Sequence, residues 1–444
     1  MIAVSDLSFK YADQPFKALD DISLEIRKGE MVLISGSTGC GKSTLGLVLA
    51  GAIPNLIPGT IWGSVSINGE TSFSQPVSER AKQLGFLMQN VEYQFFTDKV
   101  FDEVAFGLEN FRVPPEEIPA KVEEVLNLVG AGKLINRSFR KLSAGEKQRV
   151  MLAALLSLNQ NTLVLDEPLA YLDKEGQRSL VELLSRLVQR GKTIIVFEHR
   201  REPFKRVFPR EIWMKEGRIS SETPCEEFFG VLETYSSGST VLAYENVSFS
   251  WGDENPLFEG ISFEIREGES LVLLGKNGSG KTTLMNLAVG LLKPLKGRVV
   301  TCGYDTSRGV IKDIADKVAF VFQLPDHQIY FSKVLDEVLL GATSRDAAYE
   351  ELKALGLSEL SERHPRSLSM GQKRRLTIAS SLARAPKLML LDEPSVGQDD
   401  LSLAMMVRRL NRYLENGGAL LIATHDDRVA KAFGHNVVEL GEIR

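Results

Sequence analysis

Long apolar runs are missing from this sequence. No window approaches eighteen consecutive apolar residues, which is about the length that a helix needs to cross a bilayer. The N-terminus also lacks the charged, apolar and small-residue order of a secretory signal. These absences predict a chain that neither spans a membrane nor is exported, and that stays in the cytoplasm.

Cysteine and positive charge are scarce as well. The three cysteines, Cys40, Cys225 and Cys302, are too scattered for a metal knuckle and predict reduced thiols. The formal net charge of −5 disfavours broad electrostatic contact with nucleic acid, so we expect no nucleic-acid partner. The composition, with 43% hydrophobic and 25% charged residues, is typical of a globular protein, and the length predicts two or three domains.

A glycine-rich loop lies near the N-terminus. Residues 36–44, GSTGCGKST, follow the apolar run 31–34 and precede the helical pattern 45–50. A strand, a glycine loop and a helix in this order form a phosphate loop, in which backbone N–H groups and the positive end of the helix face a polyphosphate. We expect Lys42 to contact the β- and γ-phosphates and Ser43 to coordinate Mg²⁺.

The same loop recurs in the second half of the chain. Residues 275–283, GKNGSGKTT, again follow an apolar run, so coincidence is a poor explanation. The predicted nucleotide-binding residues of the two loops are Gly36, Ser37, Thr38, Gly39, Cys40, Gly41, Lys42, Ser43 and Thr44, and Gly275, Lys276, Asn277, Gly278, Ser279, Gly280, Lys281, Thr282 and Thr283. Within the first loop, Cys40 has two open interpretations, a small filler residue or a redox-sensitive thiol.

Other segments repeat in the same order. Alternating apolar and polar residues at 7–11 and 22–26 match those at 247–251 and 261–265, which predicts a small antiparallel sheet in each half. Continuous apolar runs predict buried parallel strands, and they lie at 163–165, 193–197, 388–391 and 419–423. Residues 100–142 have helical spacing and predict a mostly helical arm, broken by Pro114, Pro115 and Pro119. A Ser/Gly segment at 232–240 predicts a linker between a first domain, 1–231, and a second, 241–444.

Two capped glycine helices follow the arms. Ser143 with Glu146, and Ser369 with Gln372, have the spacing of a capping box, and a glycine, Gly145 or Gly371, lies inside each. An isolated copy would be only a helix cap. However, each glycine precedes an acidic pair, 166–167 or 392–393, by the same spacing, with 22 residues from Gly145 to Glu167 and from Gly371 to Glu393. We therefore expect each capped helix to contact the γ-phosphate of a nucleotide bound by the other half.

The acidic pairs end the predicted parallel strands, where ligands of such sheets bind. We expect Asp166 and Asp392 to hold Mg²⁺ through water, with Gln89 and Gln323 as further ligands, and Glu167 and Glu393 to polarise the attacking water. His199 and His425 each follow another apolar strand, as structural hydrogen bonders or as γ-phosphate contacts. Tyr11 and Trp251 either stack on adenine or pack in the core.

Together these motifs resemble the nucleotide-binding domain of ABC transporters, twice over essentially the whole chain. The resemblance implies an α/β fold of two tandem P-loop NTPase domains, each with a mainly parallel sheet, a small antiparallel β subdomain and a helical arm. It implies ATP and Mg²⁺ as cofactors, and Asp loops at Asp173 and Asp399. It also implies that the halves pair to enclose two ATP molecules, each between one phosphate loop and the opposite capped glycine. The sequence departs from the family pattern at Glu146, Glu198 and Gln398, and none of these changes removes a catalytic group.

The segments after the two glutamines are similar to the energy-coupling factor (ECF) ATPases. Residues 89–96 and 323–330 are rich in acidic residues, Gln and aromatics, and they lead to 100–104 and 334–338. The resemblance implies an ATPase at the inner face of the membrane that drives vitamin or metal-ion uptake through a membrane scaffold and a substrate-binding subunit. Phe95, Phe96, Ile329 and Tyr330 either line a groove for a helix of that scaffold or belong to the core. Two rival functions stay open, a tandem ATPase that acts on the ribosome and a sugar-import tandem ATPase.

Overall fold

The chain folds into two units of similar build in a computed structural model, which describes residues 1–71, 73, 75–204, 207, 210–221, 238–252, 256–276, 278–308, 311–434 and 436–441. Contacts divide the chain into Met1–Cys225 and Glu226–Arg444. The predicted boundary at residue 231 and most of the predicted linker lie outside the described residues, as do Cys225 and Asn277. The domain boundaries therefore stay a prediction.

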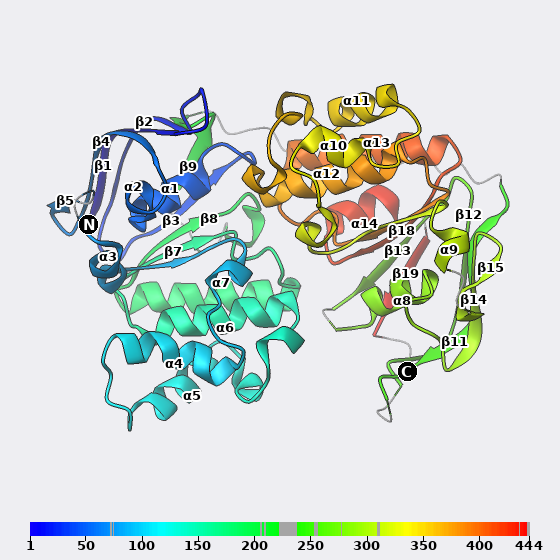
Figure 1. The fold of residues 1–444 in the computed structure, drawn as a ribbon. Coiled ribbons are helices and arrows are strands. Elements are labelled where there is room, and N and C mark those ends of the chain that lie inside the picture. The colour runs from blue at the N-terminus through cyan, green and yellow to red at the C-terminus, as the bar shows by residue number, and fades with distance from the viewer. Residues whose placement is uncertain are drawn as a thin grey trace. The chain divides into compact units, whose positions relative to one another are not determined.

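The first unit contains two sheets (Figure 1). The antiparallel sheet has the order β2 (Leu19–Ile26), β1 (Ile2–Tyr11), β4 (Gly59–Ile67) and β5 (Glu70–Thr71). The larger sheet has the order β10 (Arg218–Ser220), β9 (Arg210–Lys215), β3 (Met31–Gly36), β8 (Thr193–Phe197), β7 (Thr162–Asp166) and β6 (Leu84–Leu87). All its neighbouring strands are parallel except β10, which runs antiparallel to β9.

Helices of the first unit include a helical arm. The helices are α1 (Lys42–Leu49), α2 (Ala52–Asn55), α3 (Val77–Gln83), α4 (Val100–Asn110), α5 (Ile118–Leu128), α6 (Ala144–Ser157) and α7 (Lys174–Gln189), with short 3₁₀ turns at Val91–Gln94, Gly132–Leu134, Phe139–Lys141 and Glu202–Phe204. The predicted arm consists of α4 and α5, which pack against α6 (Figure 1). Pro114 and Pro115 separate the two helices, and Pro119 lies in the first turn of α5, where the missing N–H has no partner to lose.

The second unit repeats this plan. Its antiparallel sheet has the order β12 (Phe258–Arg266), β11 (Thr240–Phe249), β14 (Lys296–Thr301) and β15 (Tyr304–Asp305), and its parallel sheet has the order β16 (Val318–Val321), β17 (Leu388–Asp392), β18 (Ala419–Thr424), β13 (Ser270–Gly275) and β19 (Asn436–Leu440). The helices are α8 (Lys281–Ala288), α9 (Ile311–Ile314), α10 (Val334–Leu339), α11 (Arg345–Ala354), α12 (Met370–Ala383), α13 (Asp400–Glu415) and α14 (Asp427–Phe433), with 3₁₀ turns at Thr306–Arg308, Pro325–Gln328, Ser358–Leu360 and Pro365–Ser367. The fold class predicted from the sequence is confirmed.

The strands predicted from continuous apolar runs form the centre of each parallel sheet. Every residue of β7, β8, β17 and β18 is buried, because helices cover both faces of a parallel sheet. The two arms differ in length, since α4 has 11 residues and α10 has 6. Within the described residues, no helix combines the length and apolar character that a membrane crossing requires.

Candidate functional site

Each phosphate loop connects a central strand to a helix, as predicted. The loop of the first unit joins β3 to α1, and that of the second joins β13 to α8. The Lys42 ammonium donates to the carbonyl oxygens of Gly36 at 2.7 Å and Ser37 at 3.0 Å. Lys281 donates to the equivalent two carbonyls at 2.7 and 3.1 Å. Both lysines are buried at a helix N-terminus, so the two loops hold their cations in the same way.

Two glycines of the first loop occupy positions that other residues do not fit. Gly41 precedes α1 with a φ of 105°, and a Cβ there would lie 2.6 Å from the carbonyl oxygen of Ala18. A Cβ on Gly36 would collide with the carbonyl oxygen of Met214. The loop therefore stays close to the backbone around it, as the tight turn of a phosphate loop requires.

The two predicted magnesium-binding aspartates each end an inner strand of the parallel sheet of their own unit. Asp166 ends β7 and Asp392 ends β17. Burial raises the pKa of Asp166 to about 7, the adjacent Glu167 adds to the rise, and a hydrogen bond with Ser43 opposes it. Burial likewise raises the pKa of Asp392 to about 6, against a 2.7 Å hydrogen bond from the Thr282 hydroxyl. A buried carboxylate beside a hydroxyl and a second carboxylate fits a divalent cation, which would stabilise the ionised form.

The two glutamates that follow have a strained backbone. Glu167 has a φ of 45° and Glu393 a φ of 51°, and each donates its N–H to a carbonyl of the next strand, Phe197 or Ala423, at 2.8 Å. Such left-handed positions are costly for residues other than glycine and are concentrated at functional sites. Although burial acts to raise it, the pKa of each glutamate is lowered, by His199 at Glu167 and by His425 at Glu393. Each site therefore combines an aspartate whose pKa burial raises with a glutamate whose pKa the neighbouring histidine lowers.

The partners of the two glutamates differ between the halves. At Glu167, the Gln89 side chain donates to Oε2 at 2.6 Å, and Nδ1 of His199 lies 3.7 Å from Oε1. At Glu393, Nδ1 of His425 lies 2.9 Å from Oε1, and Lys281 lies 4.0 Å away. In the described part of the chain, the Gln323 side chain makes no hydrogen bond to Glu393. Both histidines thus lie beside the predicted catalytic glutamate, and among the described residues Gln89 also hydrogen-bonds to its glutamate, whereas Gln323 does not.

The capped glycine helices have the predicted geometry. Ser143 before α6 and Ser369 before α12 each form a complete capping box, with Glu146 and Gln372 as partners. Gly145 and Gly371 lie in the first turns. The capping explains one departure from the family pattern, because Glu146 accepts from the Ser143 N–H at 2.8 Å as a glutamine would.

Side chains that sequence reasoning missed connect these helices to the acidic pairs. Gln148 of α6 donates to the Pro168 carbonyl at 2.7 Å, and Gln398 donates to the Gly371 carbonyl at 2.8 Å. Arg374 of α12 is fully buried and donates to the backbone carbonyls of Phe322, Gln323 and Asp392. In the sequence, the only sign of these contacts was the unusual Gln398 before Asp399. Its hydrogen bond to the Gly371 carbonyl gives this departure a structural reason.

The two aromatic residues predicted to face adenine have different surroundings. Tyr11 is half-buried, and its hydroxyl lies in hydrogen-bond contact with Thr44 of the phosphate loop at 3.0 Å. Trp251 is 53% exposed, and its ring meets the edge of Phe249 at 5.1 Å. Tyr11 therefore contacts its phosphate loop directly, and Trp251 has the more exposed ring.

The segments after the glutamines combine core and surface residues. Phe95 and Ile329 pack against the hydrophobic core, whereas Phe96 is 73% exposed and Tyr330 is 78% exposed. A buried glutamate fixes each segment, because Glu103 accepts the N–H of Phe96 and Glu337 that of Tyr330. The core interpretation therefore holds for Phe95 and Ile329, and contact with a scaffold helix stays a prediction for the exposed Phe96 and Tyr330.

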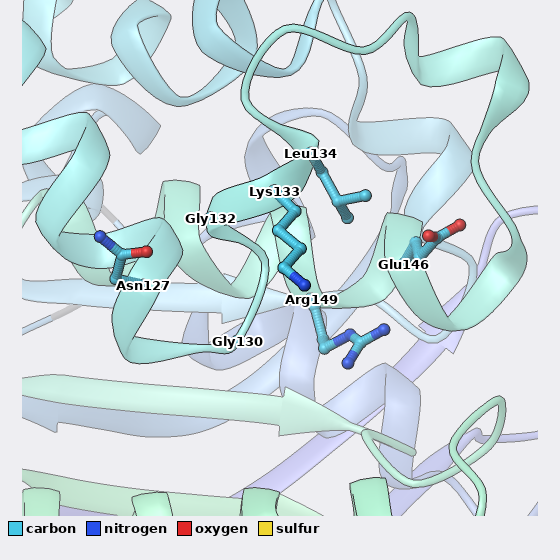
Figure 2. A pocket seen from close by; sticks show the side chains of 7 residues that line it. All are labelled: Asn127, Gly130, Gly132, Lys133, Leu134, Glu146 and Arg149. Carbon is cyan, nitrogen blue, oxygen red and sulfur yellow. The ribbon is translucent and has the colours of Figure 1, made fainter.

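The helical arm of the first unit also carries a cavity of about 460 Å³. Lys133, Glu146 and Arg149 line it, together with Asn127, two glycines and Leu134 (Figure 2). At the equivalent place in the second unit, Arg375 is buried and donates to the Leu355 carbonyl at 2.8 Å. None of the predicted catalytic or phosphate-loop residues lines this cavity, but Glu146, the capping partner of Ser143, does.

Comparison with known proteins decides the family. The family model described as ABC transporter matches residues 19–170 and 258–396. This chain belongs to the ABC transporter ATP-binding family. It is an ABC transporter ATPase with two ATP-binding domains, as the duplicated motifs predict.

Relatives of this ABC transporter ATPase align over nearly its full length. The "Putative ABC transporter ATP-binding protein" of Caldanaerobacter subterraneus is 32% identical over 98% of this chain and 89% of its own. The "Putative HMP/thiamine import ATP-binding protein YkoD" of Bacillus subtilis is 32% identical over 99% of this chain and 90% of its own. Among solved structures, a model of ribosome-bound archaeal Pelota and ABCE1 matches with a TM-score of 0.72 and 23% identity, over 98% of this chain and 76% of that one. At that identity the likeness shows the fold alone.

Proposed function

We propose that this ATPase is the ATP-hydrolysing subunit of a membrane importer of the energy-coupling factor type, for a vitamin or a metal ion. The observation that carries the proposal is the 32% identity over 99% of the chain to a protein named for HMP/thiamine import. The exposed Phe96 and Tyr330, held beside the Gln segments, are consistent with contact to a membrane scaffold. A separate substrate-binding subunit would select the solute, and the ATPase would attach to the cytoplasmic face of the membrane.

Each half supplies the residues of one hydrolytic site. Lys42 and Lys281 bind the β- and γ-phosphates, while Glu167 and Glu393 polarise the attacking water. Mg²⁺, held by Asp166 with Ser43 and Gln89, or by Asp392 with Thr282 and Gln323, would neutralise charge on the transferred phosphoryl group. His199 and His425 contact the γ-phosphate.

The two halves complete each other's sites in this proposal. Ser369 and Gly371 cover the nucleotide bound at Lys42, and Ser143 and Gly145 cover the nucleotide bound at Lys281. The reason is that a capped helix N-terminus offers N–H donors to an anion, and the γ-phosphate is the anion that hydrolysis removes. Closure and reopening of the pair would then follow the state of the nucleotide.

Affinity purification from membranes tests the importer assignment. A tagged chain, solubilised in mild detergent, is expected to bring down two integral membrane proteins. Replacing Phe96 and Tyr330 by serine should lower this recovery, whereas replacing Tyr349 of the α11 helix, a less exposed surface aromatic residue, should not. Recovery with ribosomes in place of membrane proteins would contradict the importer and favour the translation-factor alternative.

A further inference from the structure

The residue before each active-site histidine differs between the halves. Glu198 precedes His199, whereas Thr424 precedes His425, and both Glu198 and Thr424 are fully buried at the end of a parallel strand. Each uses a side-chain oxygen to cap the turn that follows. The oxygen accepts the backbone N–H two residues further along, at 3.2 Å for Glu198 and 3.0 Å for Thr424. The two residues thus share one structural role, and their remaining contacts differ.

Thr424 holds the catalytic glutamate of its site. Its hydroxyl donates to Oε2 of Glu393 at 3.3 Å, and the His425 N–H reaches the same oxygen at 3.3 Å. The His425 ring lies 2.9 Å from the other oxygen. The segment that contains His425 therefore supplies the contacts that hold Glu393.

Glu198 cannot replace this hydroxyl, because a carboxylate accepts hydrogen bonds and does not donate them. Its Oε1 lies 3.2 Å from Nδ1 of His199, which is closer than the 3.7 Å between His199 and Glu167. Its other oxygen is buried without a hydrogen bond to any described residue. Glu167 instead receives the 2.6 Å hydrogen bond from Gln89.

We propose that Glu198 is a positioning residue. It attracts the His199 ring, and Gln89 is then the residue that holds the catalytic carboxylate of Glu167. The first site then depends on the Gln89 segment for the placement of its base. The second site depends on the segment of Thr424 and His425. This inference rests on the roles proposed above for Glu167 and Glu393. It adds that different loops position the catalytic glutamate in the two sites.

A double-mutant cycle of ATP turnover in the full chain tests this. Gln89→Ala should lower the turnover of the first site about threefold or more in the parent chain, and by a smaller factor in the Glu198→Thr chain, where a threonine can hold Glu167. KM for ATP should stay within about twofold, because the phosphate loop is unchanged. Thr424 shows that threonine caps this turn, so a purely structural role for Glu198 predicts the same Gln89 effect in both chains, and that result would overturn the proposal.

Conservative and reciprocal variants sharpen the outcome. Glu198→Asp keeps the carboxylate and should keep the dependence on Gln89, whereas the isosteric Glu198→Gln should lose it. Thr424→Glu should increase the loss of turnover that Gln323→Ala causes, relative to the loss that the same replacement causes in the parent chain. A parent chain that is indifferent to Gln89→Ala would also contradict the proposal.

A direct readout comes from the histidines, of which the chain has five. In nitrogen-15 histidine spectra, the His199 ring signals should move toward those of His425 in the Glu198→Thr chain, and unchanged signals would contradict the proposed contact. The roles of the glutamates are tested separately. If Glu167→Gln with Glu393→Gln leaves turnover intact, the base assignment fails; if that pair abolishes turnover while the Gln89 effect is unaltered by Glu198→Thr, only the present inference fails.

Discussion

Lys42 and Lys281 make the same two hydrogen bonds in the two halves, whereas Glu167 and Glu393 are held by different partners. The lysine contacts depend on the loop backbone, which glycines at fixed positions determine. The glutamate contacts depend on side chains from other segments, which vary more freely in sequence. Phosphate binding is therefore the repeated part of this molecule, and control of hydrolysis is the part in which the halves differ.

The largest effect on ATP turnover is expected when the catalytic glutamate, which both halves contain, is replaced in each of them. Glu167→Gln combined with Glu393→Gln should lower ATP turnover at least about a hundredfold, because a general base typically contributes that much. Binding of a fluorescent ATP analogue should persist, since the phosphate loops are intact. The exposed Glu123→Gln is the matched control. Turnover that survives in the double variant would contradict the assignment of the base.

A tenfold change in the ATP concentration that protects Cys40 is expected when one capped glycine helix is altered. This change should distinguish the two sites. In a chain with Cys225 and Cys302 replaced by serine, alkylation of Cys40 reports on the first phosphate loop. Ser369→Ala with Gly371→Asp should raise the ATP concentration that protects Cys40 about tenfold, because the γ-phosphate loses its donors. The control pair, Ser143→Ala with Gly145→Asp, should leave that protection unchanged. Equal shifts in the two variants would contradict the pairing between halves.

A smaller effect, on KM for ATP, is expected when the aromatic residues predicted to stack on adenine are replaced. Trp251→Ala is expected to raise KM for ATP about fivefold with an unchanged melting temperature, because an exposed ring contributes mainly by stacking. Tyr11→Ala should also lower the melting temperature, since this half-buried ring contacts Phe9 and its hydroxyl contacts Thr44. Calorimetry and ATP titrations on both variants check this. A melting temperature that falls only for Trp251→Ala would contradict these roles, because it would make Trp251 the residue that packs in the core.

The smallest expected effect concerns a thiol present in one loop only. Cys40 is buried and lies 3.7 Å from the Lys42 ammonium, and Ser279 occupies its place in the second loop. Alkylation of Cys40 should remove about half of the ATP turnover, because a bulky group blocks one loop of two. The Cys40→Ser chain should resist the reagent, and ATP should protect the parent. Full activity after complete modification would contradict a position inside the phosphate site.

The repeat allowed much of this fold and site to be predicted. Alternation, apolar runs and glycine loops are local signals, so the sheets, the helical arm and both capping boxes could be predicted. The left-handed backbone of Glu167 and Glu393 could not be, because it follows from a hydrogen bond to the neighbouring strand. The buried Glu198 was visible as a departure, but its distance to His199 depends on the fold of the turn.

The segments after the glutamines show the same limit. Gln94 and Gln328 belong to the segments whose composition predicts a partner, yet each amide bonds to the backbone at the end of the preceding strand, accepting from one N–H and donating to one carbonyl. Glu92 and Asp326 form ion pairs with Lys147 of α6 and Lys373 of α12, the two capped glycine helices. Composition alone does not distinguish a side chain that holds a loop from one that meets a partner.

The buried Glu103 and Glu337 have a consequence for association. Each carboxylate accepts two consecutive backbone N–H groups, those of Phe96 and Thr97 or of Tyr330 and Phe331, and so fixes the chain where an exposed ring projects. Ordering a loop at the moment of docking costs conformational entropy, and here that ordering is already complete. A binding partner would therefore meet a preorganised aromatic anchor in each half, so that little of its affinity would be lost to restraining the loop.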